Sequence, residues 1–161
     1  MSRAFVKETQ DAGSAPLPDR PISPHRNLVT RRGLMLIERE IARHEGALGR
    51  AAGAADRDAV GRASRELRYW SARHATAEVV EPAPELDRVV FGAAVTLLRE
   101  DGSELSFRIG GEDEDDPTAG RVAWMAPVAQ ALLGSQPGEV RQLPTGEVEV
   151  ISIEGTPEAS E

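Results

Sequence analysis

The chain has 161 residues and a mass of 17.3 kDa, a length that suits one or two small domains. Its formal net charge of −8 is unevenly distributed: residues 1–80 carry 14 basic and 10 acidic groups, and residues 81–161 carry 5 basic and 17 acidic groups. A globally basic nucleic-acid coat protein is therefore excluded. The chain has no cysteine, which excludes disulfides and cysteine-based metal sites and suits a cytoplasmic protein. No run of about 18 apolar residues is present, so we expect no membrane span.

Residues 1–27 are predicted to form a disordered, proline-rich tail. Pro16, Pro18, Pro21 and Pro24 recur every two or three residues, and such a stretch buries too little apolar surface to offset the entropy of ordering. The alternative is a docking segment that becomes ordered on a partner.

Residues 28–80 carry two apolar patterns with the 3-4 spacing of a coiled-coil seam. Thr30 is a natural N-cap for the first helix, and Asp56 or Asp58 for the second. The first pattern contains Leu34, Ile37, Ile41, His44 and Leu48, and the second contains Val60, Ala63, Leu67, Trp70, His74 and Ala77.

The two patterns pair in antiparallel fashion with a constant index sum of 111, as for Leu34 with Ala77 or Leu48 with Ala63. This sum places the reversal between Ala55 and Asp56. We therefore predict an antiparallel two-helix hairpin over residues 28–80, projecting about 30–35 Å.

A linker over residues 81–87 is predicted to precede a small β-rich domain over residues 88–154, and residues 155–161 are expected to fray. Within this domain, alternating apolar residues predict strands, and Asp101-Gly102 predicts a hairpin turn. Pro127 suits the first position of one short helix. The apolar pattern shifts between Val150 and Ile151, which predicts a β-bulge or a strand buried on both faces.

Few residues are candidates for chemistry. The seam histidines His44 and His74 do not face each other. The five consecutive acidic residues 112–116 lack the alternation of a calcium-binding loop. We therefore expect a solvated acidic loop there; the alternative is a contact with a basic partner. Asp56 and Asp58, at the deduced hairpin tip, could share one Mg²⁺ with a site that supplies the other ligands. Otherwise they are a helix cap and a solvated charge. No metal site within the chain is expected.

The second predicted helix carries a basic face, which is either simply solvated or contacts an acidic channel or nucleic-acid phosphates. Its arginines include Arg57, Arg62, Arg65 and Arg68.

An antiparallel coil followed by a compact β-rich domain resembles the bacterial Gre-type transcription elongation factors, GreA and GreB. Five motifs carry the resemblance in the same order and together cover about residues 28–154. They are Asn27-Leu28-Val29-Thr30-Arg31-Arg32-Gly33-Leu34, Arg88-Val89-Val90-Phe91-Gly92-Ala93-Ala94-Val95-Thr96-Leu97, Gly110-Gly111-Glu112-Asp113-Glu114, Pro127-Val128-Ala129-Gln130-Ala131-Leu132-Leu133-Gly134 and Pro144-Thr145-Gly146-Glu147-Val148.

The resemblance implies an α+β protein, with an N-terminal antiparallel two-helix coiled-coil hairpin and a small FKBP-like β-rich domain with one short helix. It implies docking at the secondary channel of RNA polymerase, with the hairpin inside the channel and tip carboxylates assisting Mg²⁺ at the polymerase active site. The factor would have no catalysis or intrinsic cofactor of its own, would meet nucleic acid only indirectly, and is expected to be a monomer. The implied docking residues are Trp124, Met125, Ala126 and Pro127.

The sequence also departs from the family pattern. The coil is shorter by roughly three heptads, and the acidic tip motif of the family is absent. A shortened hairpin resembles that of Rnk, so the alternative is a regulator that binds polymerase or another protein without stimulating cleavage. A third hypothesis, a peptidyl-prolyl isomerase, rests on fold analogy alone. That activity needs an aromatic-lined pocket, and residues 88–154 offer few aromatic side chains to form one.

Overall fold

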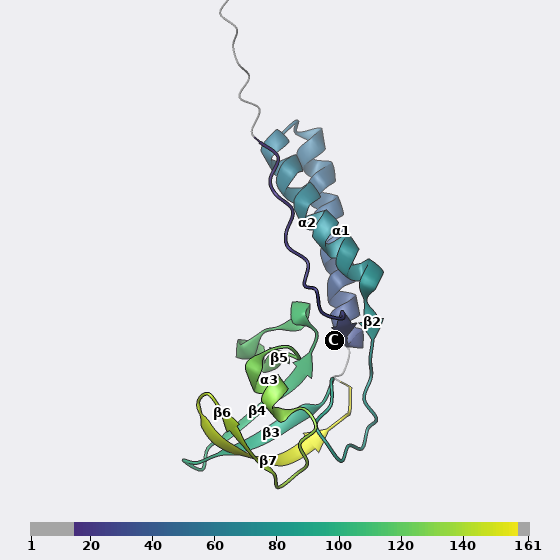
Figure 1. The fold of residues 1–161 in the computed structure, drawn as a ribbon. Helices are drawn as coiled ribbons and strands as arrows, with labels where there is room; N and C mark the ends of the chain where they lie inside the picture. Colours follow the sequence, from purple (N-terminus) through teal and green to yellow (C-terminus); the bar gives the residue numbers. More distant parts are fainter. Residues whose placement is uncertain (1–14, 158–161) are drawn as a thin grey trace, which may run out of the picture.

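The computed structural model describes residues 15–157, and two long helices dominate its first half. Helix α1 spans Arg31–Gly53 and helix α2 spans Arg57–Thr76. They run antiparallel and project from a β domain as a hairpin (Figure 1). The turn between them contains Ala55, so the reversal predicted from the index sum is confirmed.

The core of the hairpin is concentrated at its base. Val29, Ile37 and Trp70 are buried there, and partly buried Leu34 and Ile41 pack against them. Towards the tip, the seam buries only small side chains, those of Ala51 and Ala63. Because apolar burial is the main stabilising contribution, the base holds the hairpin together more strongly than the tip does.

A short pair of parallel strands closes the hairpin base. Strand β1 (Leu28–Val29) lies just before α1, and strand β2 (Glu78–Val79) lies just after α2; the two strands pair with each other. This strand pair was not predicted from the sequence. Two-residue strands give almost no periodic signal, so only their tertiary position shows them.

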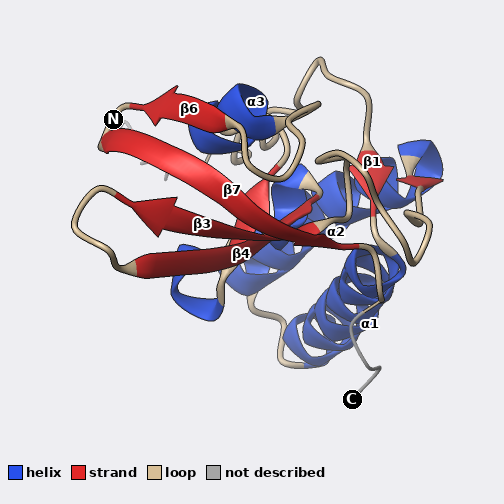
Figure 2. Cartoon of the chain, turned by 90° about the horizontal axis from the view of Figure 1, so that it is seen from below, coloured by secondary structure: helices blue, strands red, loops and turns tan. Residues whose placement is uncertain are grey.

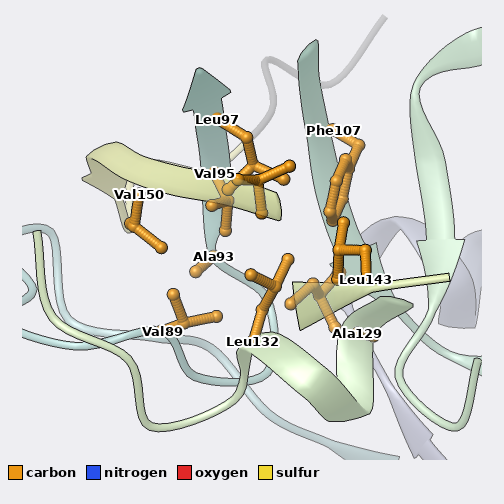
Figure 3. Packing of buried hydrophobic residues seen from close by; sticks show 11 residues of the cluster. Val89, Ala93, Val95, Leu97, Phe107, Ala129, Leu132, Leu143 and Val150 are labelled. Carbon is orange, nitrogen blue, oxygen red and sulfur yellow. The ribbon is translucent and has the colours of Figure 1, made fainter. Parts of the chain in front are cut away.

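The second half forms a five-stranded sheet in the order β5-β4-β3-β7-β6, in which only the β4–β5 pair is parallel (Figure 2). Helix α3 covers one face and inserts Ala129 and Leu132 into a core of aliphatic side chains and Phe107 (Figure 3). The elements are β3 (Ala94–Arg99), β4 (Glu104–Gly110), β5 (Arg121–Ala123), α3 (Pro127–Leu132), β6 (Val140–Leu143) and β7 (Gly146–Glu154), with 3₁₀ turns over Glu112–Glu114 and Pro117–Ala119.

The predicted fold class, a two-helix hairpin followed by a β-rich domain with one short helix, is confirmed. The predicted bulge is also present: the β3–β7 register shifts so that Thr96 pairs with Ser152 and Leu97 with Val150. Ile151 is left over between them and is 37% exposed.

The structure differs from the predicted disordered tail over residues 15–27. This segment, which we call the strap, runs along the hairpin to its base (Figure 1). Arg20 forms an ion pair with Glu66 at 2.6 Å and lies over the ring of Tyr69, 3.7 Å from its centroid. The proline-based prediction counted apolar surface and missed these polar contacts. Residues 1–14 and 158–161 lie outside the described part of the chain, whereas Gly155, expected to fray, is buried.

Within residues 15–157, neither long helix combines the length and hydropathy that crossing a membrane requires.

Candidate functional site

The hairpin tip is built by a helix-ending motif followed directly by a helix cap. The N–H of Asp56 donates to Ala51 O at 3.0 Å and that of Ala55 donates to Ala52 O at 3.1 Å, which is the hydrogen-bond pattern of a Schellman motif. Ala55 has a left-handed backbone, with φ of 52°. Asp56 then caps α2, since its carboxylate accepts from the N–H of Ala59 at 3.0 Å.

The two candidate tip carboxylates therefore have different environments. The carboxylate of Asp56 accepts a hydrogen bond from the backbone of α2, whereas Asp58 lies in the first turn of that helix and is exposed. Among residues 15–157, no three His, Asp or Glu side chains converge to hold a metal ion. A magnesium ion at this tip would need its other ligands from a partner.

The four arginines predicted to form the basic helix face divide into two pairs. Arg57 and Arg62 are exposed. Arg65 donates to Pro18 O at 2.6 Å, and Arg68 pairs with Asp19 at 2.7 Å, so the strap contacts both. Half of the predicted basic face therefore contacts another part of the same chain.

The predicted docking residues form the turn between β5 and α3. The N–H of Trp124 donates to Gly110 O at 2.9 Å, and Gln130 donates back to Trp124 O at 2.7 Å. The ring of Trp124 is half-buried and meets the edge of His25 from the strap, with centroids 6.5 Å apart. Pro127 is exposed and begins α3 as predicted. The turn is thus held in shape by the sheet, by α3 and by the strap.

A buried ion pair joins α2 to the acidic segment of the β domain. The Arg73 side chain is only 2% exposed, and its Nε donates to the Asp113 carboxylate at 2.6 Å. The hydroxyl of Tyr69 donates to the other oxygen of Asp113. Burial raises the pKa of Tyr69 to about 12, with the hydrogen bond to Asp113 as the next contribution.

A second contact joins the start of α1 to the same segment. The buried Glu114 carboxylate accepts from the Thr30 hydroxyl, from the Thr30 N–H at 3.2 Å and from the Gly111 N–H at 2.7 Å. The Thr30 hydroxyl also caps α1 by accepting from Gly33 N–H at 3.0 Å. A Cβ on Gly33 would lie 2.5 Å from the Glu114 carboxyl carbon, so glycine is what allows this approach.

We call these contacts, made by Thr30, Gly33, Tyr69, Arg73, Asp113 and Glu114, the joint. They correct the prediction of a solvated acidic loop: Glu114 is buried, and the Asp113 side chain is only 7% exposed. The loop contacts basic and polar groups of its own chain, because folding places it against the hairpin base.

The joint was not predicted from the sequence, because the residues that meet in it are 40 to 84 positions apart. Two signals could have indicated it: the Thr30-x-x-Gly33 motif and the Gly110-Gly111 pair before the acids. Both mark places where another part of the chain approaches the backbone closely.

The prediction is also wrong for one seam residue. His74 was expected to be partly buried, but its side chain is 48% exposed beside Glu38, and Arg73 occupies the buried position instead. Near the base of the hairpin, α2 packs against the β domain as well as against α1. The buried face of α2 is therefore shifted by one residue, from His74 to Arg73. His44 keeps its seam position, with a side chain 12% exposed beside Glu40.

These features define a class of protein: a two-helix hairpin held at a fixed joint on a small β domain. Comparison with known proteins gives the family. Residues 83–155 match the profile described as "Transcription elongation factor, GreA/GreB, C-term". The chain is 39% identical over 119 residues to transcription elongation factor GreA of Desulfovibrio desulfuricans, covering 70% of this chain and 74% of that protein. The chain belongs to the GreA/GreB family.

Other relatives match over shorter stretches. Transcription elongation factor GreB of Neisseria meningitidis serogroup B is 38% identical over 96 residues, which cover 56% of this chain and 59% of that protein. The chain thus spans about three fifths of the length of the GreB relatives that it matches. The solved structure of GreA factor homolog 1 of Thermus thermophilus is 22% identical and covers 81% of this chain and all of its own, with a TM-score of 0.40.

Proposed function

We propose that this protein is a Gre-type transcription elongation factor that binds RNA polymerase at its secondary channel and modulates elongation or transcript cleavage by the polymerase. The observation that carries the proposal is a projecting two-helix hairpin attached to a domain that matches the GreA/GreB C-terminal profile. The factor has no catalysis of its own in this proposal and acts as a monomer, which meets nucleic acid only within the transcription complex.

The dimensions of the hairpin suit a probe that enters a channel. The 23 residues of α1 correspond to about 34 Å at 1.5 Å per residue. A hairpin can hold its tip at a defined place in a channel only if its base is rigid. The joint supplies that rigidity through the contacts Arg73–Asp113 and Thr30–Glu114. We propose that the turn formed by residues 124–127 docks on the rim while the hairpin enters.

The charge distribution supports the same orientation. Residues 1–80 carry a net charge of +4 and residues 81–161 a net charge of −12. A basic hairpin suits a negatively charged channel, and an acidic domain suits a basic rim. Arg57 and Arg62, exposed near the tip, are the residues best placed to contact the channel.

Cleavage depends on the tip. In this part of the proposal, Asp58 and Asp56 assist a Mg²⁺ ion that is shared with the polymerase active site. The exposure of Asp58 supports this role, whereas Asp56 would have to share its carboxylate with the cap of α2.

Because the Asp56 carboxylate already caps α2, a second candidate is favoured. It is a Rnk-like regulator that occupies the channel, or acts on another protein, without stimulating cleavage. Among the described residues, the tip holds no third acidic side chain that converges with these two. The two candidates share polymerase binding and differ in whether the tip carboxylates matter.

The test uses purified RNA polymerase and a backtracked elongation complex. The wild-type chain should be retained by immobilised polymerase and should change the rate of transcript cleavage or elongation. The diagnostic variant is Asp56→Asn with Asp58→Asn, because asparagine keeps the helix cap while it removes both charges. The control is Glu104→Gln with Glu147→Gln, which makes the same charge change at exposed positions of the β domain.

If the factor assists cleavage, the tip variant binds as tightly as wild type and loses the stimulation, while the control keeps both. If wild type and tip variant both bind polymerase and neither stimulates cleavage, the regulator without cleavage is the correct candidate. Failure of the wild-type chain to bind polymerase overturns the proposal.

A further inference from the structure

The strap covers the side of α2 that carries half of the predicted basic face (Figure 1). Arg65 donates from Nε to Pro18 O at 2.6 Å, and Arg68 pairs through Nε with the Asp19 carboxylate at 2.7 Å. A carboxylate and a carbonyl oxygen are also the groups that an acidic protein surface would offer to these arginines. The strap therefore occupies the positions that such a partner would take.

The next strap residue matches α2 in the opposite sense of charge. Arg20 pairs with Glu66 at 2.6 Å, and its guanidinium lies over the Tyr69 ring, 3.7 Å from the centroid. Asp19 and Arg20, adjacent in the chain, thus each meet a group of opposite charge on the helix. This alternation shows that the strap fits α2 in a defined register.

The second half of the strap reaches the turn proposed to dock on the polymerase rim. The Ser23 hydroxyl donates to Glu112 Oε1 at 3.0 Å, and the ring of His25 meets that of Trp124 edge to face. One segment thus contacts both surfaces through which the protein is proposed to meet its partner, the basic face of α2 and the residue 124–127 turn.

Most of the strap is held by contacts that a partner can replace. Its larger apolar side chains, Leu17 and Ile22, are 45% and 44% exposed, and the Asp19–Arg68 pair is open to water. Such exposed ion pairs contribute little net stability. Only the end of the strap is buried: the Asn27 amide donates to a backbone carbonyl of α2 at 2.7 Å. The strap is therefore anchored at one end and weakly held along the rest of its length.

We propose that the strap is an autoinhibitory segment, which an acidic protein surface displaces when it binds Arg65 and Arg68. The inference rests on the proposed function, because it takes that surface to be the wall of the polymerase channel. Arg57 and Arg62 are exposed while the strap is in place, and they make the first contact. The strap then swings away about its buried end, and two further arginines become available to the channel.

The test compares two double substitutions in the full chain. The diagnostic variant is Asp19→Ala with Arg20→Ala, which removes both ion pairs between the strap and α2 and leaves the net charge unchanged. The matched control is Asp87→Ala with Arg88→Ala, which makes the same change at an adjacent, exposed Asp–Arg pair outside the strap.

The first measurement is the affinity of each chain for immobilised RNA polymerase. We expect the diagnostic variant to bind about tenfold more tightly than wild type, the factor expected when the strap covers its site about nine tenths of the time. The control should bind as wild type does. The proposal is overturned if the diagnostic variant binds polymerase no more tightly than the control.

The second measurement follows the strap itself in the otherwise unchanged chain. Spin labels at Leu17→Cys and Val140→Cys, both exposed positions, report the distance from the strap to the β domain. Bound polymerase should shift or broaden this distance distribution. A reference pair at Ala52→Cys and Val140→Cys shows whether the hairpin has moved instead. A strap distribution that polymerase leaves unchanged also overturns the proposal.

Loss of the proposed function is distinguishable from loss of this inference. If no chain binds polymerase, the proposed function fails, and a polyglutamate peptide then serves as the acidic probe. Tighter binding of polyglutamate by the diagnostic variant than by the control supports the autoinhibitory strap, and equal or absent binding overturns it. A larger gain for polyuridylate than for polyglutamate assigns the covered surface to nucleic acid and overturns the choice of an acidic protein as the partner.

Discussion

Gly33 shows how one missing side chain permits the joint. Glu114 is 6% exposed and is held by Thr30 and Gly111, so it cannot move aside without losing hydrogen bonds. We predict that Gly33→Ala destabilises the protein by about 1–3 kcal/mol, the usual cost of forcing extra atoms into a packed site. Urea unfolding followed by circular dichroism measures this change.

The control for Gly33 lies on the same helix. Nothing lies within 4 Å of a Cβ built on Gly49. Gly49→Ala should therefore stabilise the protein by about 0.5–1 kcal/mol, because alanine favours the helix. Equal effects of the two substitutions would show that the contact of Gly33 with Glu114 does not matter.

Tyr69 reports on the joint spectroscopically, since it is the one tyrosine of the chain. Its pKa is raised to about 12, chiefly by burial and then by the hydrogen bond to Asp113. In the unfolded chain a tyrosine loses its proton near pH ~10. The folded state holds the proton longer, so the stabilising contribution of this group is complete below pH ~10 and is lost as the pH rises towards 12.

We predict that phenolate absorbance of the folded protein rises only near pH 12. Asp113→Asn removes the charge and weakens the hydrogen bond, so the titration should shift to lower pH without reaching the value for an exposed tyrosine, because burial remains. Asp58→Asn, at the distant tip, should leave the curve unchanged. A wild-type midpoint near pH ~10 would mean that Tyr69 is not held as described.

At the scale of elements, the hairpin turn uses an unfavourable residue. Ala55 occupies the left-handed position of the Schellman motif, where a side chain costs roughly 1–2 kcal/mol. Ala55→Gly removes this cost but adds backbone entropy to the unfolded state, so we predict a net stabilisation of about 0.5–1 kcal/mol in thermal or urea unfolding.

The neighbouring residue provides the control for this turn. Ala54 has right-handed helical geometry, with φ of −87° and ψ of −2°. Ala54→Gly should destabilise by about 0.5–1 kcal/mol, because only the entropic cost applies. If both glycines act in the same direction, the left-handed conformation of Ala55 is not what limits the turn.

The helices could be predicted from sequence because their signals are local and repeat. Apolar residues at 3-4 spacing indicated both helices, and the constant index sum located the turn without knowledge of any contact. The bulge near Ile151 was likewise visible as a break in alternation. Each of these patterns depends on neighbours along the chain.

The joint and the strap could not be predicted in this way. Asp113 and Glu114 belong to a run of acids that, taken alone, is most favourably solvated, and only the approach of Arg73 and Thr30 makes their burial favourable. The strap was misjudged for the same reason: its prolines bury little, but Arg20 meets Glu66 and Tyr69 on α2. Long-range polar contacts leave no period in the sequence.

At the scale of the whole molecule, the protein consists of two bodies with separate cores joined by polar contacts. One core lies at the hairpin base around Ile37 and Trp70, and the other lies between the sheet and α3. The joint between them depends largely on the carboxylates of Asp113 and Glu114. Removing these charges should therefore loosen the angle between the bodies while both cores remain folded.

This prediction can be measured as a distance distribution. Because the chain has no cysteine, spin labels can be attached at Ala52→Cys near the tip and Val140→Cys on the β domain, both exposed positions. We expect a narrow distribution for the otherwise unchanged chain and a distinctly broader one after Asp113→Asn with Glu114→Gln. The charge-matched control, Glu104→Gln with Glu147→Gln, should keep the narrow distribution.

The physical reason is that neutralising Asp113 removes the nearer of the two carboxylates that pair with Arg73 and leaves only Glu112, at 3.7 Å. The hairpin can reduce the resulting cost by tilting away and letting water reach the guanidinium. Circular dichroism should show unchanged helix content, which separates tilting from unfolding. An unchanged distribution in the Asp113→Asn, Glu114→Gln chain would mean that the apolar contacts and the strap alone fix the hairpin. In that case, neutralising the joint should also leave the proposed entry of the hairpin into the polymerase channel unchanged.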